Sequence, residues 1–293
     1  MLIGAHVSAG AGLVPALDRG AGIGAEVIQV FTQSPRTWKP QLYADEILSS
    51  YREAQRTHPS VRATYCHASY LINLATSDPL LLERSVDCLS ANAAVASAIG
   101  ASGLILHVGS HKGAGIHSCL DQIAQALSKT IEVATCPLLL ENTAGGGGSV
   151  GRDFDELARI IDRVGVGPEH IGICLDTQHL WASGTSYATF ETTQAALAAL
   201  GACVNLDRLQ CIHFNDSKTA LGSNHDRHEN LGEGSIGSDA LAIFIGHPSL
   251  QQVPAILEVP GDGKGPRFED VAIARRLHAK GRKAWSEHRK DLT

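Results

Sequence analysis

Short runs of hydrophobic residues recur along the chain, and each run is followed by turn residues and then by a longer stretch with helical periodicity. Several runs are continuous rather than alternating, such as Leu104-Ile105-Leu106. Continuous runs are typical of strands that are covered on both faces, as in a parallel sheet. We therefore expect eight strands, at residues 2–7, 27–31, 61–67, 104–108, 137–141, 171–176, 209–214 and 255–259.

The segments between these runs are rich in Ala and Leu and have the length of helices. The clearest helices are expected over residues 79–99, 153–164 and 189–200. Asp78 can cap the start of the first helix, and Gly201 is placed to end the third. Strand–helix alternation repeated about eight times predicts an α/β fold of the (β/α)8 TIM barrel type, as one catalytic domain over residues 1–293. An open doubly wound sheet is the alternative, but the first run is not followed by G-x-G-x-x-G.

Imidazole and carboxylate side chains stand at the ends of six consecutive hydrophobic runs. These residues are His67, His107, Glu141, Asp176, His213 and Glu258. Neighbouring members are 34 to 45 residues apart, close to the length of one strand–helix unit. Because the carboxyl ends of barrel strands converge on one face, we expect the six side chains to meet there. His179, Asp226 and His228 lie in the loops just beyond, and Asp226 and His228 are spaced to point the same way in an extended loop.

This set of side chains favours a metal centre over isolated structural roles. A single His on a strand is usually a satisfied core or surface residue. A buried and unpaired carboxylate such as Glu141 costs on the order of several kcal/mol, and Lys and Arg are nearly absent from these strand ends. Imidazole and carboxylate without thiolate suit Zn²⁺, Mn²⁺ or Fe. Nine ligands are too many for one ion, so two or three ions with a bridging carboxylate are expected.

Composition limits the remaining possibilities. The chain is 44% hydrophobic and 18% charged, which excludes a disordered or coiled-coil protein. No stretch has the uninterrupted apolar length of a membrane span, and the N-terminus does not read as an export signal, so a cytoplasmic protein is expected. Seven cysteines without a C-x-x-C pair are expected to be free thiols. The net charge of −6 argues mildly against a nucleic-acid partner, although three zinc ions would cancel it.

The chain resembles the endonuclease IV family of abasic-site endonucleases over essentially its full length. The matching segments are GAHVS (4–8), FTQSPRTW (31–38), HASYLINL (67–74), HVGSH (107–111), ENTAG (141–145), DTQH (176–179), HFNDSK (213–218) and DRHENLGEG (226–234). Each segment alone is a weak signal, but all of them in this order are very specific.

The resemblance implies a centre of three zinc ions at the mouth of the barrel. The first ion would be held by His67, His107 and Glu141. The second would share Glu141 and be completed by Asp176, His213 and Glu258. The third would be held by His179, Asp226 and His228. Mn²⁺ or Fe in some of the sites is compatible with the same donors.

The resemblance also implies a reaction. The family cleaves the phosphodiester on the 5′ side of an abasic deoxyribose in double-stranded DNA, leaves a 3′-hydroxyl and a 5′-deoxyribose phosphate, and trims blocked 3′ ends. Divalent ions can activate water and neutralise phosphate oxygens, so a side-chain nucleophile is not required. Glu258 is the candidate catalytic residue that holds or deprotonates the attacking water, and Glu141 has an electrostatic and structural role. Asn142 and Thr143 either orient the neighbouring ligand or close a turn.

DNA contacts are carried over in the same way. Arg36, Tyr70 and Leu71 would enter the duplex where the abasic sugar is turned outward, although residues 70–72 could instead form a patch that packs locally. The other candidate phosphate or substrate contacts are Asp216, Lys218, Arg227 and the main chain of residues 232–234. The sequence departs from the family pattern at Gln33, often Lys, and at Val259, often Thr, and also at Val108 and Gln178.

Three functional classes follow from these observations. The first is a zinc-dependent DNA-repair phosphodiesterase, expected to be a monomer in the cytoplasm, associated with the nucleoid if the source is bacterial. The second is a barrel sugar isomerase or epimerase with one or two ions, against which the extra trio His179, Asp226 and His228 argues. The third is a lesion sensor without turnover, against which the complete set of nine candidate ligands argues.

Overall fold

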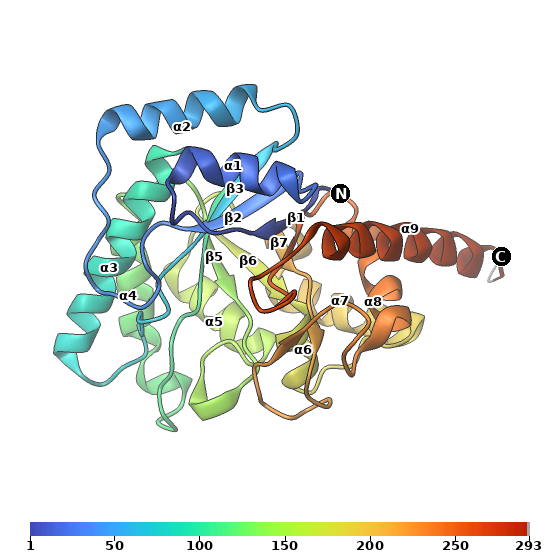
Figure 1. Ribbon diagram of the computed structural model, residues 1–293. Coiled ribbons are helices and arrows are strands. Elements are labelled where there is room, and N and C mark those ends of the chain that lie inside the picture. Colours follow the sequence, from blue (N-terminus) through green and yellow to red (C-terminus); the bar gives the residue numbers. More distant parts are fainter. Residues whose placement is uncertain (292–293) are drawn as a thin grey trace.

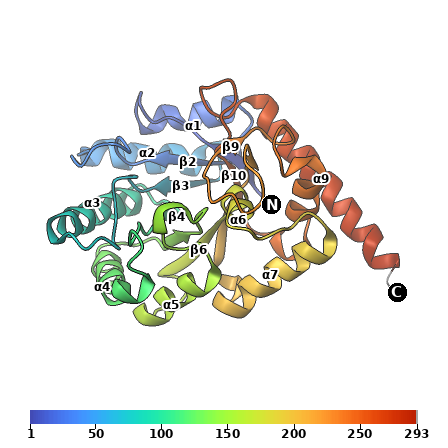
Figure 2. The same ribbon diagram turned by 90° about the horizontal axis from the view of Figure 1, so that it is seen from below.

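Eight parallel strands close into a barrel in the computed structural model, which describes residues 1–291. Around the barrel, each strand pairs with its sequence neighbour, and the last closes on the first in the order β1-β10-β7-β6-β5-β4-β3-β2. The strands are β1 Ile3–His6, β2 Val27–Phe31, β3 Ala63–His67, β4 Gly103–Leu106, β5 Leu138–Glu141, β6 Ile171–Asp176, β7 Leu209–His213 and β10 Ala255–Leu257. Figure 1 shows the barrel from the side, and the ring of helices around it is visible in Figure 2. The predicted TIM barrel is confirmed.

Helices follow the strands along the chain and cover the outside of the barrel (Figure 2). They are α1 Leu13–Gly22, α2 Asp45–Thr57, α3 Pro79–Ala98, α4 Leu120–Ile131, α5 Phe154–Val164, α6 Thr177–Ala182, α7 Phe190–Val204, α8 Gly237–Ile245 and α9 Phe268–Asp291. Short 3-10 turns are found at Ile116–Ser118, Gly146–Gly148, Leu206–Arg208 and Pro248–Leu250. Two short antiparallel strands, β8 Asp216–Ser217 and β9 His228–Glu229, pair within the long segment between β7 and α8.

The helix boundaries agree with the sequence for α3 and α5 and differ for α7. Asp78 caps α3 by accepting hydrogen bonds from the main-chain N–H groups of Leu80 and Leu81, as expected. The helix α7 does not end at Gly201 but continues to Val204. A Cβ at residue 201 would lie 3.2 Å from Leu206 Cγ, so this glycine serves close packing inside the helix. The chain instead leaves the helix at Asn205, whose φ is 63°.

Two hydrophobic layers hold the barrel together. The larger layer lies between the strands and the surrounding helices. The smaller layer fills the interior of the barrel and consists of Val27, Tyr65, Ile105, Leu139, Cys174, Cys211 and Ile256. All seven cysteines lie in the described part of the chain, and all are free thiols, as predicted. Among residues 1–291, no helix is long and apolar enough to cross a membrane. The last two residues of the domain predicted over 1–293 lie outside the described residues.

The barrel determines where the candidate ligands stand. His67, Glu141, Asp176 and His213 are the last residues of β3, β5, β6 and β7. Two strands end before their candidate ligand, because β4 ends at Leu106 and β10 at Leu257. His107 and Glu258 are therefore the first residues after their strands, which still places them at the same end of the barrel.

Candidate metal centre

All six side chains predicted to meet at the strand ends come together in overlapping groups. In one group, ligand atoms of His67, His107 and Glu141 lie within 4.8 Å of one another. In a second group, ligand atoms of Glu141, Asp176, His213 and Glu258 satisfy the same limit. Glu141 belongs to both groups through different oxygens, with Oε2 3.3 Å from His67 Nε2 and Oε1 2.8 Å from His213 Nδ1. This carboxylate can therefore bridge two cations.

The third group differs from the predicted trio in one member, because Asp176 takes the place of Asp226. It consists of Asp176, His179 and His228, again within 4.8 Å. Asp226 lies beside it, with its two oxygens 3.4 Å from His179 Nε2 and 3.4 Å from His228 Nε2. The side chain of Asp226 is 59% exposed, whereas Asp176 is fully buried. Asp176 thus connects the second and third groups, as Glu141 connects the first and second.

Main-chain carbonyls orient three of the histidines. Nδ1 of His67 donates to the carbonyl of Ala68 at 2.8 Å, and Nδ1 of His179 donates to that of Asn142 at 2.9 Å. Nδ1 of His228 faces the carbonyl of Glu258 at 3.4 Å. A carbonyl only accepts, so each contact places a proton on Nδ1 and turns Nε2 toward the cluster, where it can bind a cation. Such contacts from outside the ligand set are typical of metal sites.

Among the described residues, no Lys or Arg forms an ion pair with the carboxylates of the cluster. Within residues 1–291, the ion pairs of Glu141 and Asp176 are with histidines only, and both carboxylates are fully buried. Burial alone would raise the pKa of Glu141, but His107 and His213 hold it well below its usual range. Burial would also raise the pKa of Glu258, but the charge of the nearby His213 lowers this pKa to about 2. The site therefore presents ionised acids that require positive charge.

One unpaired atom points to where that charge would sit. Nε2 of His228 is buried, and none of the described residues supplies it with a hydrogen-bond partner. It lies 3.7 Å from Asp176 Oδ2. A buried polar atom without a partner is costly, and a divalent cation beside it would satisfy it. The donor set of nitrogen and oxygen fits Zn²⁺, Mn²⁺ or Fe.

A fourth group of possible ligand atoms is formed by Cys174, Cys211 and His213. The two cysteines are paired in register on β6 and β7 and belong to the interior layer of the barrel. Burial raises the pKa of the Cys174 thiol well above its usual value. We therefore assign these two residues to the apolar floor beneath the site.

Two asparagines fix the position of Asp176. Asn142 accepts from the main-chain N–H of Asp176 at 2.6 Å and donates to its carbonyl at 3.1 Å. Asn215 donates to Asp176 Oδ2 at 2.7 Å and accepts from the main-chain N–H of Glu258 at 2.8 Å. Asn142 therefore orients a ligand, whereas Thr143 bonds to Ser149 and closes a turn. Asn215 was not expected, although it stands in the HFNDSK segment.

His6 and Gln29 also reach the cluster, and sequence reasoning missed both. Gln29 is fully buried on β2 and bonds to His213 and Glu258. His6 is its neighbour on β1, with Nδ1 3.7 Å from Glu258 Oε1. Burial lowers the pKa of His6 to about 4 even though Glu258 opposes this shift, so His6 is neutral near pH 7. The signal available in the sequence was a polar Gln inside the continuous apolar run VIQVF.

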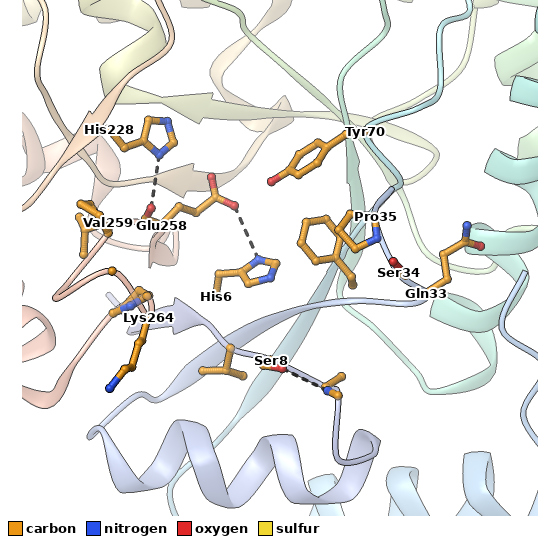
Figure 3. A pocket seen from close by; sticks show the side chains of 18 of the residues that line it. His6, Ser8, Gln33, Ser34, Pro35, Tyr70, His228, Glu258, Val259 and Lys264 are labelled. Carbon is orange, nitrogen blue, oxygen red and sulfur yellow. Dashed lines mark hydrogen bonds and ion pairs between the residues drawn. The ribbon is translucent and has the colours of Figure 1, made fainter. Parts of the chain in front are cut away.

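A cavity of about 890 Å³ opens beside the cluster. Figure 3 shows Glu258 and His6 between two walls, with Tyr70 and Pro35 on one side and Lys264 on the other. Glu258 and His228 are the only predicted ligands that line this cavity. Because the side chain of Glu258 is 14% exposed while Glu141 is 1% exposed, Glu258 is the carboxylate that a substrate or water in the cavity can touch.

Tyr70 stands at the rim of the cavity over the candidate ligands. Its ring lies edge-on to Phe31 at 5.2 Å and to His67 at 5.4 Å between centroids, and the residue is 53% exposed. Leu71 is partly exposed, whereas Ile72 is buried in the core. Ile72 therefore packs into the core, whereas Tyr70 packs against neighbouring rings and also keeps an exposed face.

The polar candidates for DNA contact differ in their availability. Arg36 is exposed on the loop after β2. Lys218 lies 3.8 Å from Glu229, and Arg227 donates to the carbonyl of Asp226. Asp216 is fully buried and accepts hydrogen bonds from main-chain N–H groups of residues 217, 232, 234, 236 and 237. Its carboxylate thus holds the 228–237 segment in place and is not available to a phosphate.

Gln33 and Val259 show what the departures from the family pattern do. The side chain of Gln33 donates to the carbonyl of Thr37 at 2.8 Å and accepts from Asn92 at 2.9 Å. These bonds hold the side chain of Gln33 against the protein. Val259 is buried next to Glu258, and Glu258 takes its side-chain hydrogen bond from Gln29 instead of a neighbouring hydroxyl.

Metal binding to the third group is expected to release a proton from His179. Burial alone would lower the pKa of this imidazole, but the charge of Asp176 and the hydrogen bond to Asp226 raise it to about 10. His179 is therefore protonated near pH 7 and has to lose its proton to bind a cation. We expect the apparent zinc affinity of this group to rise about tenfold per pH unit between pH 6 and 8. Titration calorimetry of zinc binding in buffers of different ionisation enthalpy measures the number of protons released. A binding heat that does not depend on the buffer would contradict the release of a proton from His179.

Comparison with known proteins places this geometry in a family. The model of the xylose isomerase-like TIM barrel family matches residues 17–284. A protein named probable endonuclease 4 from Halothermothrix orenii is 38% identical over 282 residues, covering 94% of this chain and all of the relative. A protein of the same name from Thermosipho africanus is 36% identical over 262 residues, covering 89% and 93% of the two chains.

Solved structures agree with these relatives. The crystal structure of endonuclease IV from Thermus thermophilus superposes with a TM-score of 0.80 at 31% identity, covering 98% of this chain and all of that one. A D-tagatose 3-epimerase-like protein has a TM-score of 0.70 at 17% identity over 98% and 99% of the chains, which shows the shared fold alone. The family model over most of the chain and relatives above 30% identity over nearly its full length show that the chain belongs to the endonuclease IV family of abasic-site endonucleases.

Proposed function

We propose that this DNA-repair nuclease hydrolyses the phosphodiester on the 5′ side of an abasic site in double-stranded DNA. The products are a 3′-hydroxyl and a 5′-deoxyribose phosphate, and the same site trims blocked 3′ ends. The proposal rests on one observation: three ligand groups lie side by side at the mouth of the barrel, with Glu141 shared by the first and second and Asp176 by the second and third. Three linked cation sites suit a phosphodiester, whose reaction develops charge on several oxygens at once.

The residues that would hold three zinc ions follow from these groups. His67, His107 and Glu141 would hold the first ion, with Mn²⁺ or Fe as possible occupants of part of the centre. The second ion would be held by Glu141, Asp176, His213 and Glu258. The third would be held by His179, Asp226 and His228, with Asp176 adjacent. When bound, zinc supplies an acidified water molecule and Lewis-acid stabilisation of phosphate oxygens.

Glu258 and Glu141 would have different roles in the reaction. Glu258 lines the cavity and can accept the proton of an attacking water, because Gln29 occupies only Oε1 of its carboxylate. Glu141 is out of reach of the cavity, so its contribution is to hold the ligand groups together and to supply negative charge. Asn142 and Asn215 keep Asp176 in one orientation between the second and third groups.

Lesion recognition would use the rim of the cavity. Tyr70 and Leu71 present apolar surface beside the ligands, and Arg36 on the neighbouring loop presents a guanidinium group. An apolar wedge and an arginine can replace the stacking lost when an abasic sugar is turned outward. Lys218 and Arg227 would contact phosphates on the other side, with Glu229 sharing the charge of Lys218. We propose a monomer acting in the cytoplasm, at the nucleoid if the source is bacterial.

The test combines metal content with cleavage. The purified protein is loaded with zinc, its metal content is measured by elemental analysis, and it is incubated with a duplex that holds one tetrahydrofuran abasic analogue. We expect about three zinc ions per chain and a single cut 5′ to the lesion, with the undamaged duplex of the same sequence left intact. A fully metallated protein that binds the lesion without cutting it would contradict the proposal and indicate a lesion sensor.

A further inference from the structure

His213 is oriented differently from the other histidines of the cluster. In His67, His179 and His228, Nδ1 contacts a main-chain carbonyl and Nε2 faces the cluster. His213 presents Nδ1 instead, 2.8 Å from Glu141 Oε1 and 3.3 Å from Glu258 Oε2. Its Nε2 lies 2.8 Å from Oε1 of Gln29. A side chain, and not a main-chain carbonyl, therefore determines which nitrogen of His213 faces the cluster.

The amide of Gln29 has only one possible orientation. Its Nε2 lies 2.6 Å from Glu258 Oε1, and an ionised carboxylate can only accept. The second hydrogen of the same Nε2 is directed at His6 Nδ1, 2.9 Å away. Oε1 of the amide must then face His213 and accept from Nε2. All donor and acceptor positions of this contact set agree with one another, so the proton on Nε2 of His213 is fixed by the carboxylate of Glu258 through the amide. Nδ1 donates to Glu141 and is the nitrogen that would give up its proton to bind a cation.

Register explains why the amide reaches both ligands. Gln29 pairs with His6 of β1 on one side and with Tyr65 of β3 on the other. It is fully buried, and its partners come from β7 and from the residue after β10. The side chain thus spans the interior of the barrel directly beneath the second ligand group. A side chain of the same size without an amide would leave Nε2 of His213 and Oε1 of Glu258 buried and unpaired.

We propose that Gln29 is a positioning residue of the metal centre. It holds His213 in the tautomer that presents Nδ1, and it holds Glu258 with Oε2 turned toward the second ligand group. His6 holds the amide in place from β1. The inference rests on the proposed metal centre, but it concerns ion binding and not DNA. Partners of this kind change metal affinity or activity by about 10- to 100-fold when they are removed.

The test compares Gln29→Met and Gln29→Leu with the wild-type holoenzyme. Both changes keep an apolar side chain of similar size and remove all three hydrogen bonds. We expect one of the bound zinc ions to be lost to a chromophoric chelator with a dissociation constant about 10- to 100-fold weaker than in the wild type. The visible absorption of the Co²⁺-loaded variants should also change, because the geometry at His213 and Glu258 changes. In the cleavage reaction, kcat should fall by a larger factor than KM changes.

Thr64→Val is the matched control. Thr64 is a buried polar residue on the neighbouring strand β3, and its hydroxyl bonds to Tyr51 at 2.6 Å, away from the ligands. This variant should keep the zinc affinity and the Co²⁺ spectrum of the wild type. Wild-type zinc affinity and spectrum in both Gln29 variants would overturn the inference. So would loss of folding in both variants while Thr64→Val folds, because Gln29 would then be required for the barrel itself.

The zinc measurement needs no DNA, so the two proposals can fail separately. A wild-type protein that binds three zinc ions and does not cut lesion-bearing DNA contradicts the proposed reaction only. Unchanged zinc affinity in the Gln29 variants of an active nuclease contradicts the role of Gln29 only.

Discussion

Replacing Glu258 by Gln is expected to lower the cleavage rate by about 10²- to 10⁴-fold, the range of general acid–base catalysis, while lesion-bearing DNA still binds. The amide has nearly the same shape, and Gln29 can still donate to its oxygen. What is lost is the carboxylate that faces the cavity and can accept a proton, and with it one charged member of the second ligand group, so the zinc content of the variant is measured alongside. Single-turnover cleavage of a duplex with one tetrahydrofuran site measures the rate, and titration of the same duplex measures binding.

A control substitution separates this effect from a general loss of charge. Glu26 lies before β2, at the opposite end of the barrel, and pairs with Arg275 at 3.3 Å. Glu26→Gln removes one partly exposed carboxylate far from the site and should leave cleavage within about twofold, as surface substitutions generally do. Turnover close to wild type in Glu258→Gln would remove Glu258 from the proton-transfer step.

The gathering of the candidate ligands at the strand ends could be predicted because two simple regularities coincide there. Continuous apolar runs identify strands buried on both faces, and the residue that ends such a run in a barrel points to the catalytic face. His67, Glu141 and His213 follow this rule directly. The rule tolerates the small errors in strand length, since His107 and Glu258 remain at the mouth of the barrel one residue beyond their strands.

The residues that orient the ligands could not be found in this way. Gln29 and His213 are 184 residues apart, and their contact depends on how strands on different sides of the barrel face one another. Asn215 likewise connects Asp176 with the residue after β10. No spacing in the sequence encodes such contacts. The only local hint is a polar residue where burial on both faces requires a partner, as with Gln29 inside VIQVF.

For Asp216, the sequence suggested a contact with substrate, but the structure shows another role. A carboxylate in the HFNDSK segment, beside predicted ligands, suggested contact with the substrate. In the structure its two oxygens are saturated by main-chain N–H groups of the following segment. A short strand pair, β8 with β9, brings that segment back over the barrel and places His228 at the cluster. Asp216 therefore acts on the site only by holding the segment that carries His228.

Replacing His228 by Ala is expected to remove one of three zinc ions and to lower cleavage by about a thousandfold. His228 supplies one of the candidate ligand atoms of the third group, and its buried Nε2 has no hydrogen-bond partner among residues 1–291. Loss of several kcal/mol of charge stabilisation in the transition state corresponds to about three orders of magnitude. Elemental analysis of the dialysed protein gives the zinc content, and single-turnover cleavage gives the rate.

His225→Ala is the matched control for this substitution, because His225 is an exposed imidazole of the same segment and lies outside all ligand groups. It should keep three zinc ions and the wild-type rate. A sugar isomerase or epimerase of this fold would need only the one or two ions of the other groups, so His228→Ala would matter little to it. Unchanged zinc content and rate in His228→Ala would therefore contradict the three-ion centre while leaving the first two groups as a smaller site of different chemistry.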